Sequence, residues 1–255
     1  MSAQPAVDTG MTLVEHLTEL RKRLIICALA VLVGMLVGFV LYDWVFDFLL
    51  APYKDVANSS NSLGDGKLLQ IDPLEGFSIR IKTSAYTGIA FAMPIILWQI
   101  WRFVTPGLYP HERRYAIPFV VSALALFVLG AGLAYYTLPR ALEFLVDIGG
   151  DNLITAFAPG KYFQLITYMM LAFGIGFEFP IVLIFLQLAG ILETDTLRKG
   201  RRFAIVGILV LVAVITPSGD PISMLMLSVP MIIFYEVAII IGRILTNRQA
   251  AKANA

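Results

Sequence analysis

The sequence predicts an all-α integral membrane protein with six transmembrane helices. Hydrophobic residues make up 58% of the 255 positions and charged residues only 15%, which departs from soluble globular domains in both respects. Apolar runs long enough to cross a bilayer recur along the whole chain. We expect a single polytopic domain over residues 1–255. Its predicted spans lie near residues 24–42, 77–101, 115–138, 162–190, 203–215 and 221–241.

The positions of the basic residues predict that both termini are cytoplasmic. Thirteen of the 19 Lys and Arg residues fall in the tails, or in connections that a six-span path places on the same side as the tails. They are Arg21, Lys22, Arg23, Arg102, Arg113, Arg114, Arg198, Lys199, Arg201, Arg202, Arg243, Arg248 and Lys252. Cytoplasmic loops of membrane proteins carry such an excess of basic residues. The bias therefore orients the whole chain.

The first predicted helix begins before the membrane, in the segment 11–24 that reads MTLVEHLTELRKRL. Thr12 and Glu15 have the spacing of a capping box, which satisfies backbone donors at a helix start. Leucines at helical spacing then form an apolar side, opposite a charged one. We expect an amphipathic helix that continues into the first span. There, Gly34 and Gly38 form a small-xxx-small pair that allows another helix to approach closely.

The outer connections are predicted to be irregular. The segment 43–76 contains many Asn, Ser and Gly residues, so it is expected to be an exposed loop. Its first part, residues 44–50, is amphipathic and is expected to lie at the membrane surface before Pro52 turns the chain. The acidic segment 139–161 is expected to form a second outer loop.

The last two spans are both expected to be short helices, joined by a tight turn, TPSGDP at residues 216–221. The fifth span, 203–215, holds thirteen residues, or about 20 Å of helix against a hydrocarbon core of about 30 Å. Such a short span requires local thinning of the bilayer or a partner that covers the mismatch. Pro221 suits the first position of the sixth helix.

No catalytic constellation or cofactor motif is apparent. The two histidines, His16 and His111, lie on separate segments without the spacing of metal ligands. The single cysteine, Cys27, cannot form an intramolecular disulfide. No glycine-rich phosphate loop is present. We expect no enzymatic activity, no metal, no cofactor and no nucleic-acid partner.

Two acidic residues among basic neighbours are the candidate binding groups. Glu19 lies on the first helix, and Glu112 lies in the PHERR connection between the second and third spans. Both positions are predicted on the cytoplasmic side, where two carboxylates could each accept a bidentate bond from one of two adjacent arginines. The alternative is local pairing, of Glu19 with Arg23 one helical turn later and of Glu112 with Arg114 or a lysine.

Glu178 lies within the fourth predicted span, where an ionisable residue is costly and indicates function by default. It could form a polar site on a concave surface, or hydrogen-bond to a neighbouring helix for packing. A proton- or ion-coupled small-molecule transporter using Glu178 is one alternative function. The chain offers few other polar groups for a central substrate cavity. A purely structural assembly subunit is a further alternative.

Four stretches, in this order along the chain, resemble the TatC family, the core subunit of the twin-arginine protein translocase. They are HLTELRKRL at 16–24, WRFVTPGLYPHERR at 101–114, FGIGFEFP at 173–180 and TPSGD at 216–220. The resemblance implies six helices curved into a concave, cupped wall. It also implies that Glu19 and Glu112 bind the arginine pair of a signal peptide.

The resemblance extends to further residues and to partners. Arg21, Phe103, Leu108 and Pro52 match positions tied to signal-peptide handling or function in that family. The implied partners are twin-arginine signal peptides of folded proteins, the single-span subunits TatA and TatB along the fifth and sixth spans, further copies in a larger complex, and membrane lipid. Sites of partner docking would include the turn at Asp220. The family often carries Gln where this chain has Met224. Ser223 or Thr216 could supply the polar docking contact in its place.

Overall fold

The computed structural model describes residues 13–59, 68–70, 72–104, 116–149, 157–188 and 190–253. Over these residues the chain is helical and contains no strand, which confirms the predicted all-α class. The helices are α1 (Leu13–Val40), α2 (Tyr42–Ser59), α3 (Glu75–Val104), α4 (Ala116–Gly149), α5 (Pro159–Gly176), α6 (Phe179–Leu188), α7 (Thr194–Lys199), α8 (Arg201–Ile215) and α9 (Pro221–Ala253).

Five segments of the described residues are long and apolar enough to cross a membrane. They are Val14–Val40, Glu75–Phe103, Ile117–Gly149, Pro159–Gln187 and Pro221–Ile244. Helix α8 has 15 residues, which is about 22 Å of helix and shorter than a hydrocarbon core of about 30 Å. The chain is thus a multi-pass membrane protein, and a sixth crossing by α8 stays a prediction.

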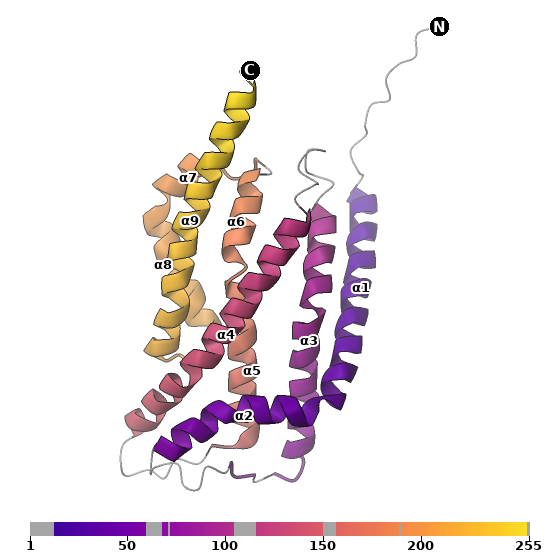
Figure 1. Ribbon diagram of the computed structural model, residues 1–255, viewed down its shortest axis with the longest axis vertical. Helices are drawn as coiled ribbons and strands as arrows, with labels where there is room; N and C mark the ends of the chain where they lie inside the picture. The colour runs from indigo at the N-terminus through magenta and orange to yellow at the C-terminus, as the bar shows by residue number, and fades with distance from the viewer. Residues whose placement is uncertain are drawn as a thin grey trace.

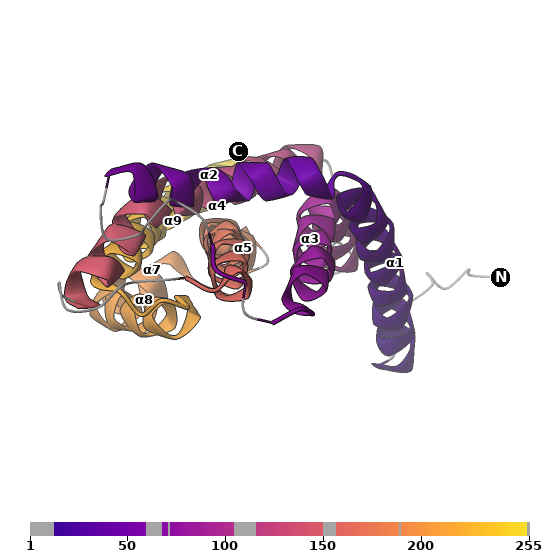
Figure 2. The same ribbon diagram turned by 90° about the horizontal axis from the view of Figure 1, so that it is seen from below.

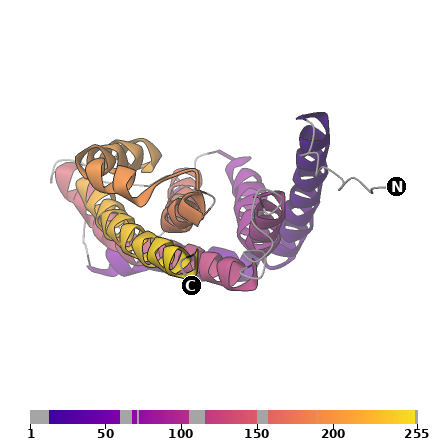
Figure 3. The ribbon, with the colours of Figure 1, turned by 90° about the horizontal axis from the view of Figure 1, so that it is seen from above.

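The long helices form a curved wall. Helix α1 begins and α9 ends at the same end of the molecule, while α2 lies across the opposite end (Figure 1). Seen from below, α4 and α9 lie on one side with α2, and α1 and α8 project from the two extremities of this side (Figure 2). The view from above shows the same curvature, with α3 and α5 between α1 and α8 (Figure 3).

Glycines allow α1 and α3 to pack with their backbones in contact. A Cβ atom placed on Gly34 would lie 2.6 Å from the carbonyl oxygen of Gly88, and one on Gly88 would lie 2.5 Å from the backbone nitrogen of Met35. Gly38 faces Ser84 in the same way, because a Cβ atom placed on Gly38 would lie 3.0 Å from the Ser84 carbonyl oxygen. The close approach predicted from the Gly34 and Gly38 spacing is confirmed, and its partner is α3.

The core centres on α5, which packs against α2, α4 and α9. Tyr162, Phe163 and Phe173 on α5 are almost completely buried. Phe163 stacks on Phe46 of α2 with ring centroids 4.5 Å apart, while the Phe173 backbone contacts the glycine at position 130 of α4. Burial of large aromatic side chains contributes strongly to stability, so this cluster holds the middle of the wall together.

The predicted turn at Pro52 is wrong, because α2 runs through this residue to Ser59. A proline inside a helix leaves the carbonyl four residues earlier without its usual donor. Here that carbonyl belongs to Phe48, and the Tyr135 hydroxyl of α4 donates to it at 2.9 Å. The freed acceptor is therefore satisfied from another helix. The face of α2 that carries Val45 and Leu49 is buried.

Two other segments predicted as connections contain helix. Helix α4 continues through Pro139 to Gly149, so the expected outer loop at 139–161 is wrong over its first half. Leu138, Leu142 and Val146 are buried along one face of this extension, which explains why it stays helical. The expected connection at 191–202, between the fourth and fifth predicted spans, contains the short helix α7. The expectation of a short sixth helix is wrong, because α9 has 33 residues, of which 24 form an apolar segment long enough to cross a membrane.

Candidate functional site

A polar pocket lies between the first turns of α1 and the last turns of α3. This α1/α3 pocket has a volume of about 440 Å³. Its polar lining includes Glu15, Thr18, Glu19 and Arg23 from α1 and Gln99 and Arg102 from α3. The pocket lies at the end of the molecule opposite α2 (Figure 1). The charged face of α1 predicted from the sequence therefore meets the end of the second apolar segment.

Glu19 is only partly neutralised within this pocket. Its Oε1 atom forms an ion pair with Arg23 one turn later on α1, so the local pairing considered from the sequence is present. Arg23 also donates to Gln99 Oε1 at 3.3 Å. The other carboxylate oxygen of Glu19, Oε2, is buried and has no hydrogen-bond partner among the described residues. The Nε atom of Arg23 is likewise buried without a partner among these residues, so the Glu19–Arg23 pair leaves one acceptor and one donor unsatisfied, and each such group is costly.

The other residues predicted for signal-peptide binding are placed unevenly. Phe103 is half-buried and its ring lies 4.5 Å from that of His16 on α1. Arg21 is exposed on α1 and does not line the pocket. Glu112 and Leu108 lie outside the described residues. Convergence of Glu19 and Glu112 therefore stays a prediction.

The pocket also contains two polar residues that sequence reasoning missed. Gln99 is buried near the end of α3 and holds Arg23, and Arg102 lines the pocket one turn later. Gln99 lies in an otherwise apolar run, and a buried polar side chain within a membrane segment is itself a signal of a packing or functional partner. The sequence could have indicated Gln99 as a candidate, but it could not identify Arg23 as its partner.

Glu178 lies where the predicted fourth span is interrupted. Helix α5 ends at Gly176 and α6 begins at Phe179. Pro180 has no N–H to continue the backbone ladder, which explains the interruption. Glu178 is half-buried, and its Oε1 atom is buried without a hydrogen-bond partner among the described residues. The structure thus places this acid at a break in a helix, and its role stays a prediction.

Asp220 caps α9. It is almost fully buried, and its Oδ1 atom accepts a hydrogen bond from the Ser223 N–H at 2.7 Å, while Oδ2 accepts from the Ser218 hydroxyl. An aspartate whose side chain accepts a hydrogen bond from the backbone N–H three residues later has the geometry of a helix N-cap. Met224, the position considered for partner docking, is half-buried and packs against the core.

We expect Asp220→Ala to lower the free energy of unfolding by about 1 kcal/mol, the usual cost of losing an N-cap. Thermal unfolding of the detergent-solubilised protein would measure the change. Ser218→Ala is the comparison, because it removes the donor to Oδ2 but leaves the bond from the Ser223 N–H; the loss that Asp220→Ala shows beyond this variant belongs to the cap. An Asp220→Ala variant as stable as the parent would show that α9 does not depend on this cap.

Comparisons with known proteins give consistent results. A family model described as Sec-independent protein translocase protein (TatC) matches residues 15–230. The Sec-independent protein translocase protein TatC of Frankia casuarinae is 40% identical over 253 residues, covering 97% of this chain and 70% of that protein. The protein of the same name from Aquifex aeolicus is 37% identical over 242 residues, covering 94% of this chain and 98% of its relative.

Solved structures agree with the sequence relatives. A crystal structure described as that of the twin arginine translocase receptor TatC superimposes with a TM-score of 0.76 at 37% identity, covering 91% of this chain and 100% of that chain. A second crystal structure of the receptor, in the detergent DDM, has the same TM-score at 38% identity.

Proposed function

Because the chain belongs to the TatC family of Sec-independent protein translocase proteins, we propose that it is the signal-peptide receptor and scaffold subunit of a twin-arginine translocase. It binds twin-arginine signal peptides of folded proteins and recruits the single-span subunits TatA and TatB. Export is then driven by the proton-motive force, and the chain itself is not an enzyme.

The observation that carries the receptor role is the Oε2 atom of Glu19 in the α1/α3 pocket, which has no hydrogen-bond partner within the part of the chain that the structure describes. A guanidinium group offers several N–H donors in a planar fork that matches a carboxylate. One arginine of a signal peptide would donate to this oxygen and compete with Arg23 for the other. Glu112, on the connection that follows α3, would take the second arginine.

The orientation of the protein follows from the same role. The α1/α3 pocket lies at the end of the molecule where α1 begins and α9 ends. With the basic tails and loops in the cytoplasm of a cell bounded by an inner membrane, this end faces the compartment in which precursors are made. Six crossings, with α8 as a short fifth one, complete the path.

Helices α8 and α9 would receive the single-span subunits. Phe203, Val206 and Val210 of α8 are exposed apolar residues. Arg201 of α8 forms an ion pair with Glu236 of α9 at 2.7 Å, which holds the two helices together near one end. A second apolar helix on this edge would cover the hydrophobic mismatch of α8. No pore through this chain is required, and further copies would complete the complex.

The transporter alternative is not favoured. It requires a central cavity with several polar groups around Glu178, and the family found by the comparisons is one of protein translocase components. Uptake of a small solute by liposomes that contain this protein alone would support that alternative.

A peptide-binding measurement tests the receptor role. The purified protein is titrated with a fluorescent signal peptide that carries Arg-Arg, and with the same peptide carrying Lys-Lys. We expect Glu19→Gln to weaken binding of the Arg-Arg peptide about 10- to 100-fold, because a hydrogen bond between charged groups contributes about 1.5–3 kcal/mol. The preference for Arg-Arg over Lys-Lys should shrink in the same variant.

Glu193→Gln is the matched control, since Glu193 is an exposed acid outside the pocket whose side chain makes no capping bond to α7. It should leave both affinities unchanged. Equal affinity of the parent and Glu19→Gln for the Arg-Arg peptide would remove Glu19 from the proposed site.

A further inference from the structure

We propose that a second pocket, between α3 and α5, binds the phosphoethanolamine headgroup of a membrane phospholipid. This α3/α5 pocket has a volume of about 330 Å³ and is lined by the first turns of both helices. Both helices begin at the end of the molecule crossed by α2 (Figure 1), so the pocket lies opposite the α1/α3 pocket. The binding site is additional to the signal-peptide site and does not depend on it.

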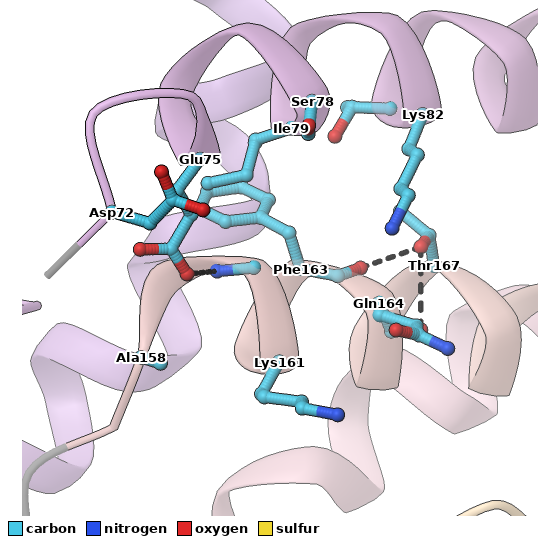
Figure 4. Close-up of a pocket in the computed structure, with 12 residues that line it drawn as sticks. Asp72, Glu75, Ser78, Ile79, Lys82, Ala158, Lys161, Phe163, Gln164 and Thr167 are labelled. Carbon is cyan, nitrogen blue, oxygen red and sulfur yellow. Dashed lines mark hydrogen bonds between the residues drawn. The ribbon is translucent and has the colours of Figure 1, made fainter. Parts of the chain in front are cut away.

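The helices that line the pocket are held together by a hydrogen bond and by buried side chains. Glu75, the first residue of α3, accepts a hydrogen bond from the Gly160 N–H of α5 at 2.8 Å, which ties the two helices together. Phe163 is almost fully buried behind the pocket and lies beside Ile79 (Figure 4). Thr83 and Thr167 are buried at its inner end. The cavity is therefore part of the packing of α3 against α5.

Two lysines line this cavity, and neither has an anionic partner among the described residues. Lys82 of α3 and Lys161 of α5 are exposed, and neither side chain forms an ion pair or hydrogen bond with any of those residues. The Lys82 side chain points from α3 toward Thr167 of α5 (Figure 4). Two ammonium groups on adjacent helices provide six donors for a phosphate. They are the groups that a phosphodiester anion would bind.

The depth of Lys82 fits a lipid phosphate. The segment Glu75–Phe103 has 29 residues, about 43 Å of helix, close to the full thickness of a bilayer with its headgroups. Lys82 lies seven residues after Glu75, about 10 Å along the helix. From there its long side chain can extend back to the headgroup level. An ammonium group at this depth with no anionic partner among the described residues favours an anion from the surrounding lipid.

The order of charges along the pocket distinguishes one type of headgroup. Asp72 and Glu75 lie together at one end, and Lys82 lies toward the other (Figure 4). The carboxylates are at the start of α3, and Lys82 is deeper in the membrane segment. In phosphatidylethanolamine the ammonium lies outermost and the phosphate nearer the acyl chains. Acids outside and Lys82 inside match this order, whereas an anionic headgroup would meet carboxylates at its outer end.

An adjoining cavity provides a place for the acyl chains. Lys161 and Gln164 also line a cavity of about 350 Å³, together with Leu165, Val214 and Ile215 of α5 and α8. Apolar side chains therefore lie next to the proposed phosphate position. A lipid bound by its headgroup could lay its chains against this surface and fill the concave side of the wall at that end.

Native mass spectrometry of the full-length protein tests this site. The protein is delipidated in detergent and titrated separately with phosphatidylethanolamine and phosphatidylglycerol. We expect phosphatidylethanolamine to bind more tightly. The double variant Lys82→Gln, Lys161→Gln should lose about tenfold in affinity, as expected for charge-assisted bonds, and each single variant should lose less. Asp72→Asn should reduce the preference for phosphatidylethanolamine, while its amide oxygen can still accept the bond from the Leu74 N–H.

Lys54→Gln is the control, because Lys54 is an exposed lysine of α2 at the same end of the molecule. It should leave lipid affinity unchanged. Equal affinity of the parent and the double variant would overturn the proposal, as would an equal loss in Lys54→Gln. Displacement of the lipid by millimolar inorganic phosphate would assign the lysines to free phosphate instead. Displacement by the Arg-Arg peptide would assign the pocket to the signal peptide.

Discussion

Replacing Gly34 by leucine should separate α1 from α3 and sharply weaken binding of a twin-arginine peptide. Even a Cβ atom at this position would lie 2.6 Å from the Gly88 carbonyl oxygen and 3.0 Å from its Cα. These are backbone atoms, so no side-chain rotation on α3 can relieve the clash. Overpacking of this kind typically costs about 1–3 kcal/mol and more where the backbone must move. We expect a loss of about 3 kcal/mol in the free energy of unfolding.

The effect on binding follows from where the α1/α3 pocket lies. Glu19 and Arg23 are on α1, and their partner Gln99 is on α3. A shift of α1 therefore separates the two halves of the pocket. Thermal unfolding in detergent measures the stability, and the Arg-Arg peptide titration measures the affinity.

Ala28→Leu is the matched control for this prediction, because Ala28 is an exposed residue of the same helix. It adds a similar apolar side chain facing away from α3 and should change neither stability nor affinity. If Gly34→Leu behaved like Ala28→Leu, the close packing of α1 on α3 would not exist in the membrane protein.

Gly130→Ala should destabilise the centre of the wall by about 1–3 kcal/mol, a large effect for one methyl group. The added Cβ atom would lie 2.5 Å from the carbonyl oxygen of Phe173 and 2.9 Å from the Phe177 ring. Phe173 is fully buried, and its carbonyl accepts the Phe177 N–H at 2.9 Å beside the break between α5 and α6. The clash would therefore act on the segment that carries Glu178. Denaturant or thermal unfolding would measure it.

Gly132→Ala provides the comparison on the same helix. No heavy atom lies within 4 Å of the position that its Cβ would take, and alanine favours a helix over glycine by about 1 kcal/mol. This variant should be as stable as the parent or slightly more stable. Equal melting temperatures for Gly130→Ala and Gly132→Ala would contradict the tight contact between α4 and α5.

The helical class and most membrane segments could be predicted because they depend on local composition. Apolar runs of bilayer length form helices in order to satisfy their own backbone groups. The glycine pair on α1 predicted that another helix packs closely against it, but the pair did not identify that helix as α3. Proline gave the wrong signal at position 52, since the donor that replaces its missing hydrogen bond comes from Tyr135, 87 residues away from Phe48. No local pattern contains that information.

The candidate site could be predicted only in part. Glu19 stands out in the sequence as an acid on a basic helix, and the TatC resemblance assigned it a role. One of its oxygens is paired with Arg23, and the other is buried with no donor from any described residue. The burial depends on how α3 packs against the first turns of α1. Gln99 and the lysines of the α3/α5 pocket were not singled out, because isolated polar residues acquire meaning only from their neighbours.

By itself, the sequence determined that this chain is a helical multi-pass membrane protein, and it singled out Glu19 as the candidate for binding arginine. Hydropathy, helix signals and charge bias act over a few turns and can be read locally. The tertiary structure decided that α2 and α4 run through their prolines, that Gly34 meets Gly88, and which oxygen of Glu19 has no donor among the described residues. Each of these features depends on atoms brought together from distant parts of the chain. The local sequence is compatible with several arrangements, and side-chain packing and hydrogen bonding between distant segments determine which one forms.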